Sequence, residues 1–389
     1  MLTKTLSRLS DFFIFVLVFS FYNDNFMVEH FGAQSLKALF FLFYLFYSFT
    51  FAQNFKTMTG TQDKMFFAFL LFDMTLLLIQ MLFGWNVSFA PAGFMLIAIL
   101  SVILYFSRYP LQKLLYMVWI SMMASVVMCY FSPPLDEWTF RKSGGTDDPN
   151  EFSTQLLIFL FAAFYLYTQN KSKLFLAVSI VFFTYGILHA ASMSSFLMLG
   201  VLGVLGIVRL LLIKPQIFFS TKALLGLLLI SAVATQINPI KFEAVSNILS
   251  RTKDTGTAGF RMHSWIAGKH MVEKNPLLGV GVDEFRANEY KYEEGHMLGS
   301  SPSPHNVYIK LIAESGIVIF LLFVLFIGNI IVSNFKILFY TNEWWLMMIL
   351  FSSLLMGLTL GFLYDKFFWI SIALMMNINY ELNRRKAIP

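Results

Sequence analysis

Long apolar runs separated by short polar stretches cover most of the chain. Runs of about 20 apolar residues can cross a bilayer as helices. We count twelve such runs, at 7–23, 35–53, 65–85, 88–107, 112–131, 152–168, 173–191, 194–213, 219–237, 306–333, 344–363 and 366–381. The pattern predicts an all-α fold class, a polytopic integral membrane protein with about twelve transmembrane helices.

Composition supports this prediction. Of the 389 residues, 58% are hydrophobic and 13% are charged, whereas a soluble domain is about 25% charged. This excludes a soluble enzyme and a disordered chain. A single cysteine, Cys129, excludes an internal disulfide and a paired-cysteine metal site.

The basic residues predict the orientation. If both termini are cytoplasmic, the short loops facing the cytoplasm hold most of the lysine and arginine, whereas the short loops near 24–34, 86–87 and 192–193 hold none. This asymmetry follows the positive-inside rule. The inward-facing basic residues are Lys4, Arg8, Lys56, Lys64, Arg108, Lys113, Lys171, Lys173, Lys214, Lys222, Lys336, Arg384, Arg385 and Lys386.

Two longer polar segments, 132–151 and 238–305, fall on the opposite side of the membrane. Long polar loops in a protein otherwise built of spans commonly carry function. The predicted organisation is therefore a transmembrane part over 1–237 with the short outer loop 132–151, a large helical loop over 238–305, and further transmembrane helices with a cytoplasmic tail over 306–389.

The long loop contains its own predicted structure. Residues 259–274 have helical periodicity, with Phe260, Trp265, Ile266 and Val272 on the expected apolar side. Asn275-Pro276 ends this helix, because a residue before proline avoids the helical region. Gly279 and Gly281 then suit a tight turn with close backbone approach. Asp283 is expected to cap a second short helix.

The end of the loop, Ser303-Pro304-His305-Asn306, predicts the start of the next span. Ser303 is a suitable N-cap and Pro304 suits the first helical position. His305 and Asn306 then lie in the first turn, where free N–H groups favour anions and a neutral imidazole. His305 is a candidate general base, and the alternative is a histidine that makes ordinary hydrogen bonds at the membrane interface.

Several short motifs together resemble one family. Arg261-x-x-x-Trp265, residues 275–281 (NPLLGVG), Phe285, His305-Asn306-x-Tyr308-Ile309 and Glu314-x-Gly316 resemble the C-terminal signature of the O-antigen ligase and polymerase superfamily. The stretch 144–150 (GGTDDPN) resembles a conserved stretch that precedes a span in many members. The resemblance covers the topology and residues 140–320.

The resemblance implies a GT-C-like membrane glycosyltransferase at the periplasmic face of the bacterial inner membrane. It implies a glycan donor carried on undecaprenyl pyrophosphate, an acceptor that is a glycan or lipid A–core, and a place for a chain-length regulator. Besides these partners, the protein contacts the lipid bilayer, and no nucleic acid is expected. The resemblance implies no cofactor and no metal.

One departure from the family concerns an arginine. Members usually carry Ser-Arg-Gly where this chain has His189-Ala190-Ala191-Ser192-Met193-Ser194. If that arginine contacts the donor pyrophosphate, another cation must replace it here. Arg141 and Arg286 are the candidates, and the alternative for both is an ordinary solvated or structural arginine.

The reaction that the resemblance implies requires particular side chains. A pyrophosphate that leaves gains negative charge, and arginine binds phosphate oxygens with two parallel donors. Arg261 and His305 are therefore the predicted catalytic residues. The predicted substrate-binding residues are Arg141, Arg286, Asn306, Tyr308, Glu314 and Trp265.

Glu314 also has a structural interpretation. A carboxylate within a span indicates function by default, but Lys310 lies one helical turn away and could form an ion pair with it.

Three functions remain open from the sequence. The first is polymerisation of lipid-linked repeat units, which the departure at 189–194 favours weakly. The second is ligation of the glycan to lipid A–core. The third is a transporter or flippase, which would be expected to show internal repeats and ionisable residues near the membrane midplane. We find no convincing repeat in the sequence.

Overall fold

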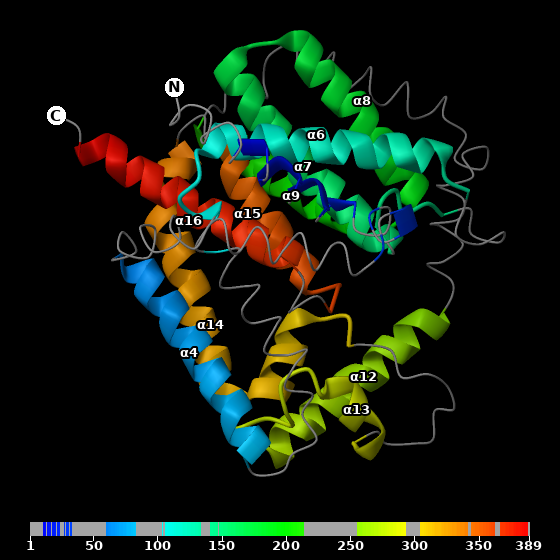
Figure 1. Cartoon of the computed structure of the whole chain (residues 1–389), viewed down its shortest axis with the longest axis vertical. Coiled ribbons are helices and arrows are strands. Elements are labelled where there is room, and N and C mark those ends of the chain that lie inside the picture. The colour runs from blue at the N-terminus through cyan, green and yellow to red at the C-terminus, as the bar shows by residue number, and fades with distance from the viewer. Residues whose placement is uncertain are drawn as a thin grey trace. The chain divides into compact units, whose positions relative to one another are not determined.

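A computed structural model describes residues 11–12, 14–16, 18–20, 22–23, 27, 29–30, 32, 60–82, 103, 106–133, 141–146, 148–213, 255–292, 304–340, 344–361 and 366–387. The elements found in these residues are all helical (Figure 1). They are α4 (Thr61–Leu82), α6 (Leu111–Phe131), α7 (Pro149–Asn170), α8 (Lys173–Ala190), α9 (Met193–Ile213), α12 (Thr255–Lys274), α13 (Phe285–Asn288), the 3-10 helix η2 (Glu289–Lys291), α14 (Val307–Tyr340), α15 (Trp344–Gly357) and α16 (Lys366–Ala387).

Six of these helices are long and apolar enough to cross a membrane, namely α4, α6, α7, α8, α9 and α14. Two shorter apolar helices, at Trp344–Gly357 and Phe368–Ile378, fall in two further predicted runs. The all-α membrane fold is confirmed, whereas the number of twelve spans is not. The predicted runs 35–53 and 219–237 lie outside the described residues, 88–107 lies largely outside them, and 7–23 is described in part.

The described helices belong to two compact units. The first unit comprises residues 1–33, 115–254 and 337–352, and within it α7 packs on α8 and α9. Asp148 caps α7 by accepting from the Asn150 N–H at 2.7 Å, and Pro149 takes the first helical position. The Trp119 indole donates to Ser179 Oγ at 2.8 Å and so joins α6 to α8.

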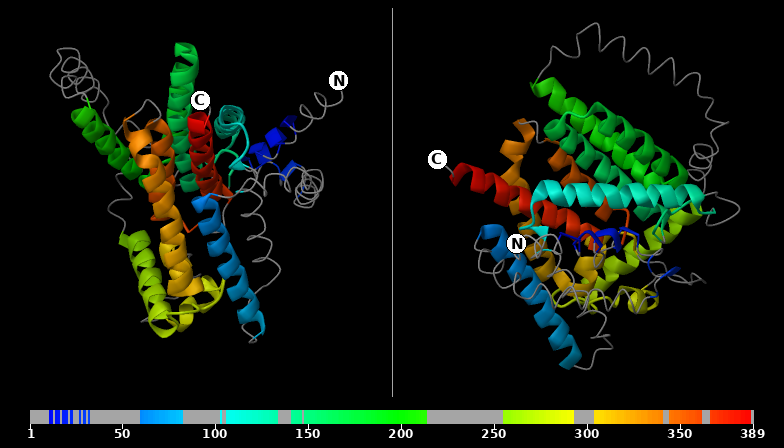
Figure 2. Two further views of the ribbon diagram at one scale, coloured as in Figure 1. Left: turned by 90° about the vertical axis from the view of Figure 1, so that its left-hand side faces the viewer. Right: turned by 45° about the horizontal axis from the view of Figure 1, so that its top comes forward.

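The second unit comprises residues 34–114, 255–336 and 353–389. Helices α4 and α14 run side by side in opposite directions (Figures 1 and 2). Their aromatic side chains pair in antiparallel order, with Phe66 against Phe326 and Phe69 against Phe323, and Trp369 of α16 stacks on Phe69. Buried Arg108 pairs with Asp63 at the start of α4 at 3.0 Å.

Helix α14 is broken at Gly316, whose backbone angles of φ 78° and ψ 176° are not helical. In a regular helix the Ile317 N–H would bond to the Ala313 carbonyl. Here it donates instead to the Pro276 carbonyl at 2.9 Å. The break therefore leaves helix carbonyl groups available to another segment of the chain.

Candidate functional site

The helix predicted over 259–274 is present as α12. Its apolar side differs from the prediction, because Trp265 and Ile266 are 41% and 38% exposed. The buried residues are smaller, and Ala267 and Met271 are fully buried. A Cβ added to Gly268 would overlap Ile309 of α14. The close approach of α12 to α14 therefore requires a small residue at Gly268, while Met271 and Val272 pack further along the same helix.

The loop 275–284 follows α12 and attaches to the break in α14. The Val280 N–H donates to the Ala313 carbonyl at 2.8 Å, and the Gly281 N–H donates to the Glu314 carbonyl at 3.1 Å. Gly279 has φ +66°, and a Cβ on it would overlap the Glu314 carbonyl group. The predicted tight turn with close backbone approach is confirmed, and its partner is the Glu314-x-Gly316 motif.

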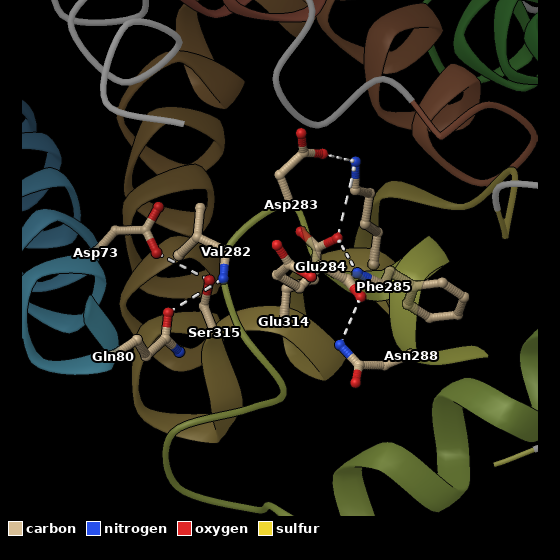
Figure 3. A network of polar contacts seen from close by, with 10 residues as sticks. Asp73, Gln80, Val282, Asp283, Glu284, Phe285, Asn288, Glu314 and Ser315 are labelled. Atoms are coloured by element: carbon tan, nitrogen blue, oxygen red, sulfur yellow. Dashed lines mark hydrogen bonds and ion pairs between the residues drawn. The ribbon is translucent and has the colours of Figure 1, made fainter. Parts of the chain in front are cut away.

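Helix α4 supplies two side chains to the same place (Figure 3). The Gln80 amide donates to the Leu278 carbonyl at 2.9 Å and accepts from the Val282 N–H at 3.2 Å. Asp73, two turns earlier, accepts from Ser315 Oγ at 2.8 Å. Both α4 side chains are buried. Because residues seven apart lie on the same face of a helix, one face of α4 holds both the loop and the break in α14.

Three charged side chains beside this loop are linked by ion pairs (Figure 3). Lys310 Nζ lies 2.8 Å from Asp283 Oδ1 and 3.8 Å from Glu314 Oε1. Glu314 is fully buried, and its Oε1 also accepts from the Phe285 N–H at 3.0 Å. The structural pair of Lys310 with Glu314 is confirmed, and Asp283 joins it.

The expectation that Asp283 caps the following helix is wrong. Glu284 occupies the cap position of α13 and makes no side-chain cap bond. Asp283 has φ +60°, a left-handed conformation that aspartate tolerates, and its exposed carboxylate points to Lys310. The ion pair with Lys310 thus takes the place of the capping bond.

The predicted helix start at Ser303 is also wrong, since α14 begins at Val307. Asn306 is the cap, and its Oδ1 accepts from the Tyr308 and Ile309 N–H groups at 3.0 Å each. His305 therefore precedes the helix in a turn with φ +46°. Asn306 therefore already occupies the Tyr308 and Ile309 N–H groups, which are not available to an anion beside His305.

Trp265 connects the turn of His305 to α12. Its indole Nε1 donates to the Pro304 carbonyl at 2.8 Å. Arg261 lies one helical turn before Trp265, so both are on one side of α12, and Arg261 is half-buried. The Trp265 bond thus joins the two segments that carry the predicted catalytic residues.

Asn306 and Tyr308 hold α14 to the end of α15. The Asn306 amide donates to the Leu358 carbonyl at 3.4 Å, and the Tyr308 hydroxyl donates to the Leu354 carbonyl at 2.7 Å. These contacts fix the start of α14, which directly follows the turn of His305. The predicted role of both residues in substrate binding stays a prediction.

The two arginines considered as replacements for the missing family arginine differ in burial and in their contacts. Arg286 is exposed on α13. Arg141 lies in the first unit and is nearly buried, with Nε donating to the Ala190 carbonyl at 2.9 Å and Nη2 donating to Asn150 Oδ1 at 2.7 Å. Arg141 therefore contacts the turn between α8 and α9, where the family arginine is missing.

The sequence prediction missed Asp73 and Gln80. A carboxylate in the middle of the predicted span 65–85 was the available signal, because such residues are rare and commonly functional. Gln80 gives no comparable signal. Its partners lie 198 and 202 residues away in the sequence, so only the fold identifies it.

Comparison with known proteins agrees with the motifs. Residues 157–324 match the family model of O-antigen ligase. The matched segment includes Arg261, the loop 275–284, His305 and the break at Gly316, and it begins after Arg141 and the 144–150 stretch. The search of curated proteins finds no match. Over residues 157–324 the chain is thus similar to the O-antigen ligase family, which supports its resemblance to the O-antigen ligase and polymerase superfamily.

Proposed function

We propose that this protein is a membrane glycosyltransferase that moves a glycan from undecaprenyl pyrophosphate to an acceptor hydroxyl, without a metal, at the periplasmic face of the inner membrane. The observation that carries the proposal is the O-antigen ligase match over residues that form one connected site. Within that site the loop 275–284 is bonded to the break in α14, and Trp265 joins α12 to the turn of His305.

Arg261 is proposed to contact the donor pyrophosphate. Its guanidinium can present two parallel donors to phosphate oxygens, which lysine cannot do. Stabilising the charge that develops on the leaving group is commonly the largest catalytic contribution. Both Arg261→Ala and Arg261→Lys should therefore lose most activity, while Lys269→Ala, an exposed change two turns along the same helix, should keep it.

His305 is proposed to accept the proton of the attacking hydroxyl. The support is its motif position and its place in a turn that Trp265 and Asn306 hold on either side. Loss of a general base typically slows a reaction by roughly 10²–10⁴-fold. His305→Gln should show that loss, because glutamine can hydrogen-bond but cannot take the proton. Normal turnover in His305→Gln would leave the residue a binding role only.

Polymerisation is the preferred reaction, with ligation to lipid A–core as the alternative. The purified protein in liposomes, supplied only with lipid-linked repeat units, should produce longer glycan chains. Arg261→Ala in the same liposomes is the control for contaminating activity. If chains lengthen only as transfer to added lipid A–core, the protein is a ligase.

Arg141 is proposed to supply the cation that the family places between α8 and α9. Its bond to the Ala190 carbonyl supports this, because the guanidinium reaches the turn itself. Arg141→Ala should lose activity, and Met193→Arg, which restores Ser-Arg at residues 192–193, should recover part of it. No recovery in a protein that folds normally would mean that Arg141 does not replace the family arginine.

A further inference from the structure

Two large apolar side chains project from the loop 275–284. Leu277 and Leu278 are 62% and 44% exposed, although the residues that follow, Gly279, Gly281 and Val282, are buried. In a water-soluble loop, adjacent exposed leucines would be unfavourable, because each loses the gain of burial. The elements that hold the loop determine what surrounds the two leucines.

The loop lies alongside two membrane-spanning helices. Gln80, which bonds to Leu278 and Val282, is within the candidate span Thr61–Leu82 and two residues from its end. Ile317, which bonds to the Pro276 carbonyl, is within the candidate span Val307–Phe335. Residues 276–282 are thus level with the last turns of α4 and not with a segment beyond its end.

Much of the backbone of the loop is hydrogen-bonded within the protein, as suits a segment at membrane depth. The Pro276 and Leu278 carbonyls accept hydrogen bonds, and the N–H groups of residues 279–282 all donate them within the protein. Non-helical backbone at membrane depth persists only where the protein itself satisfies its polar groups. A loop in water needs less internal pairing than residues 279–282 show, because water satisfies its polar groups.

The exposed leucines continue an apolar surface of the same unit. Near the loop, α4 exposes Leu78, Met81 and Leu82 by 49%, 49% and 81%, and α14 exposes Val318 and Leu321 by 44% and 52%. Side chains of this kind on spanning helices face lipid. A Cβ on Gly316 would overlap the Leu277 backbone, so Leu277 lies directly beside this surface.

We infer that Leu277 and Leu278 are embedded in the hydrocarbon of the bilayer, in the leaflet next to the C-terminal end of α4. The loop 275–284 is then a re-entrant element that enters the membrane beside α4 and α14. Asp283, at the end of the same loop, pairs with Lys310 of α14. The occupant of this surface is the acyl chains of the bilayer.

A nitroxide spin label on a single cysteine tests the inference. Cys129→Ala removes the native thiol, and Leu277→Cys in that background introduces the labelled position. In lipid nanodiscs, collision with oxygen, which concentrates in hydrocarbon, is compared with collision with a water-soluble nickel chelate. Leu277→Cys should collide several-fold more with oxygen than with nickel, as should Val324→Cys on the exposed side of α14.

The matched control is Glu273→Cys in the last turn of α12, whose native side chain is 55% exposed. It should collide more with nickel than with oxygen. A Leu277→Cys label that favours nickel, as the Glu273 label does, would overturn the inference. If Leu277→Cys does not yield folded protein, Leu278→Cys decides the question by the same criterion.

Discussion

Two loops, one in each unit, are held in place by different kinds of contact. Residues 141–150 of the first unit are held by side chains, since Arg141 bonds to Asn150 and to the Ala190 carbonyl, Thr146 bonds to Ser143, and Asp148 caps α7. Residues 275–284 of the second unit are held mainly by backbone groups that bond to the break in α14. The first arrangement depends mainly on which side chains are present, although an added Cβ on Gly144 or Gly145 would also overlap neighbouring atoms. The second depends mainly on backbone approach at Gly279, with the Gln80 side chain as a further contact.

This difference has a physical consequence. A side-chain hydrogen bond can be removed alone, at a net cost of about 0.5 to 1.5 kcal/mol when neither group is charged. A hydrogen bond between backbone groups is lost only if an added side chain keeps the two segments of the chain apart. Substitutions in the 275–284 loop are therefore expected to be tolerated at most positions and severe at the glycines.

The largest effect is expected for Gly279→Ala. Its left-handed backbone conformation costs about 1 to 2 kcal/mol for alanine, and the new Cβ would also overlap the Glu314 carbonyl. The variant should lose folded protein or show a strongly lowered melting temperature in detergent. The matched control is Gly328→Ala in α14, where nothing lies within 4 Å of an added Cβ. Equal melting temperatures for Gly279→Ala and the native protein would exclude the close approach.

A smaller effect is expected for Gln80→Leu. The change leaves the partly buried Leu278 carbonyl and the buried Val282 N–H without this partner, at a cost of about 1 to 3 kcal/mol for each group that stays unpaired. Gln80→Glu, which keeps the acceptor for Val282 but loses the donor to Leu278, should be intermediate. Thermal melting of both variants measures this. The contrast between the two loops would weaken if Gln80→Leu destabilised the protein more than Gly279→Ala does.

The sequence predicts most of the described helices to within a few residues. The runs 112–131, 173–191 and 194–213 correspond to α6, α8 and α9. This success has a simple origin, because the thickness of the hydrocarbon sets the length of an apolar run and the bilayer requires helical backbone. Neither constraint depends on how the helices pack.

The sequence predicts less of the site. The glycine turn at 279–281 is predicted correctly, because positive φ is a local property of glycine. The start of α14 is not predicted correctly, because Ser303 and Asn306 are both suitable caps by sequence. The contact of Asn306 with Leu358 comes from the fold and distinguishes the two. Asp73 lies 242 residues from Ser315, and no local pattern indicates such a pair.

The first loop provides the next prediction. Asn150→Ala removes the acceptor for Arg141 Nη2, and hydrogen bonds to charged groups contribute about 1.5 to 3 kcal/mol. Melting temperature should fall less than in Gln80→Leu. Asn150→Asp keeps an acceptor oxygen and should retain most of the stability. An equal loss in Asn150→Asp would mean that the shape of the amide, and not its oxygen, holds the loop.

The smallest effect on stability is expected for Trp265→Phe. This change removes one side-chain hydrogen bond from the second unit, in which backbone groups hold most of the loop 275–284. The aromatic ring remains, and only the donor to the Pro304 carbonyl is lost, so stability should fall by about 0.5 to 1.5 kcal/mol. Turnover should fall more than stability, because the indole links the helix of Arg261 to the turn of His305, and small displacements of a catalytic group are costly. Glycan transfer measured under saturating donor separates the two effects. A variant with native turnover and a lowered melting temperature would show that Trp265 only stabilises the unit, and that other contacts position His305.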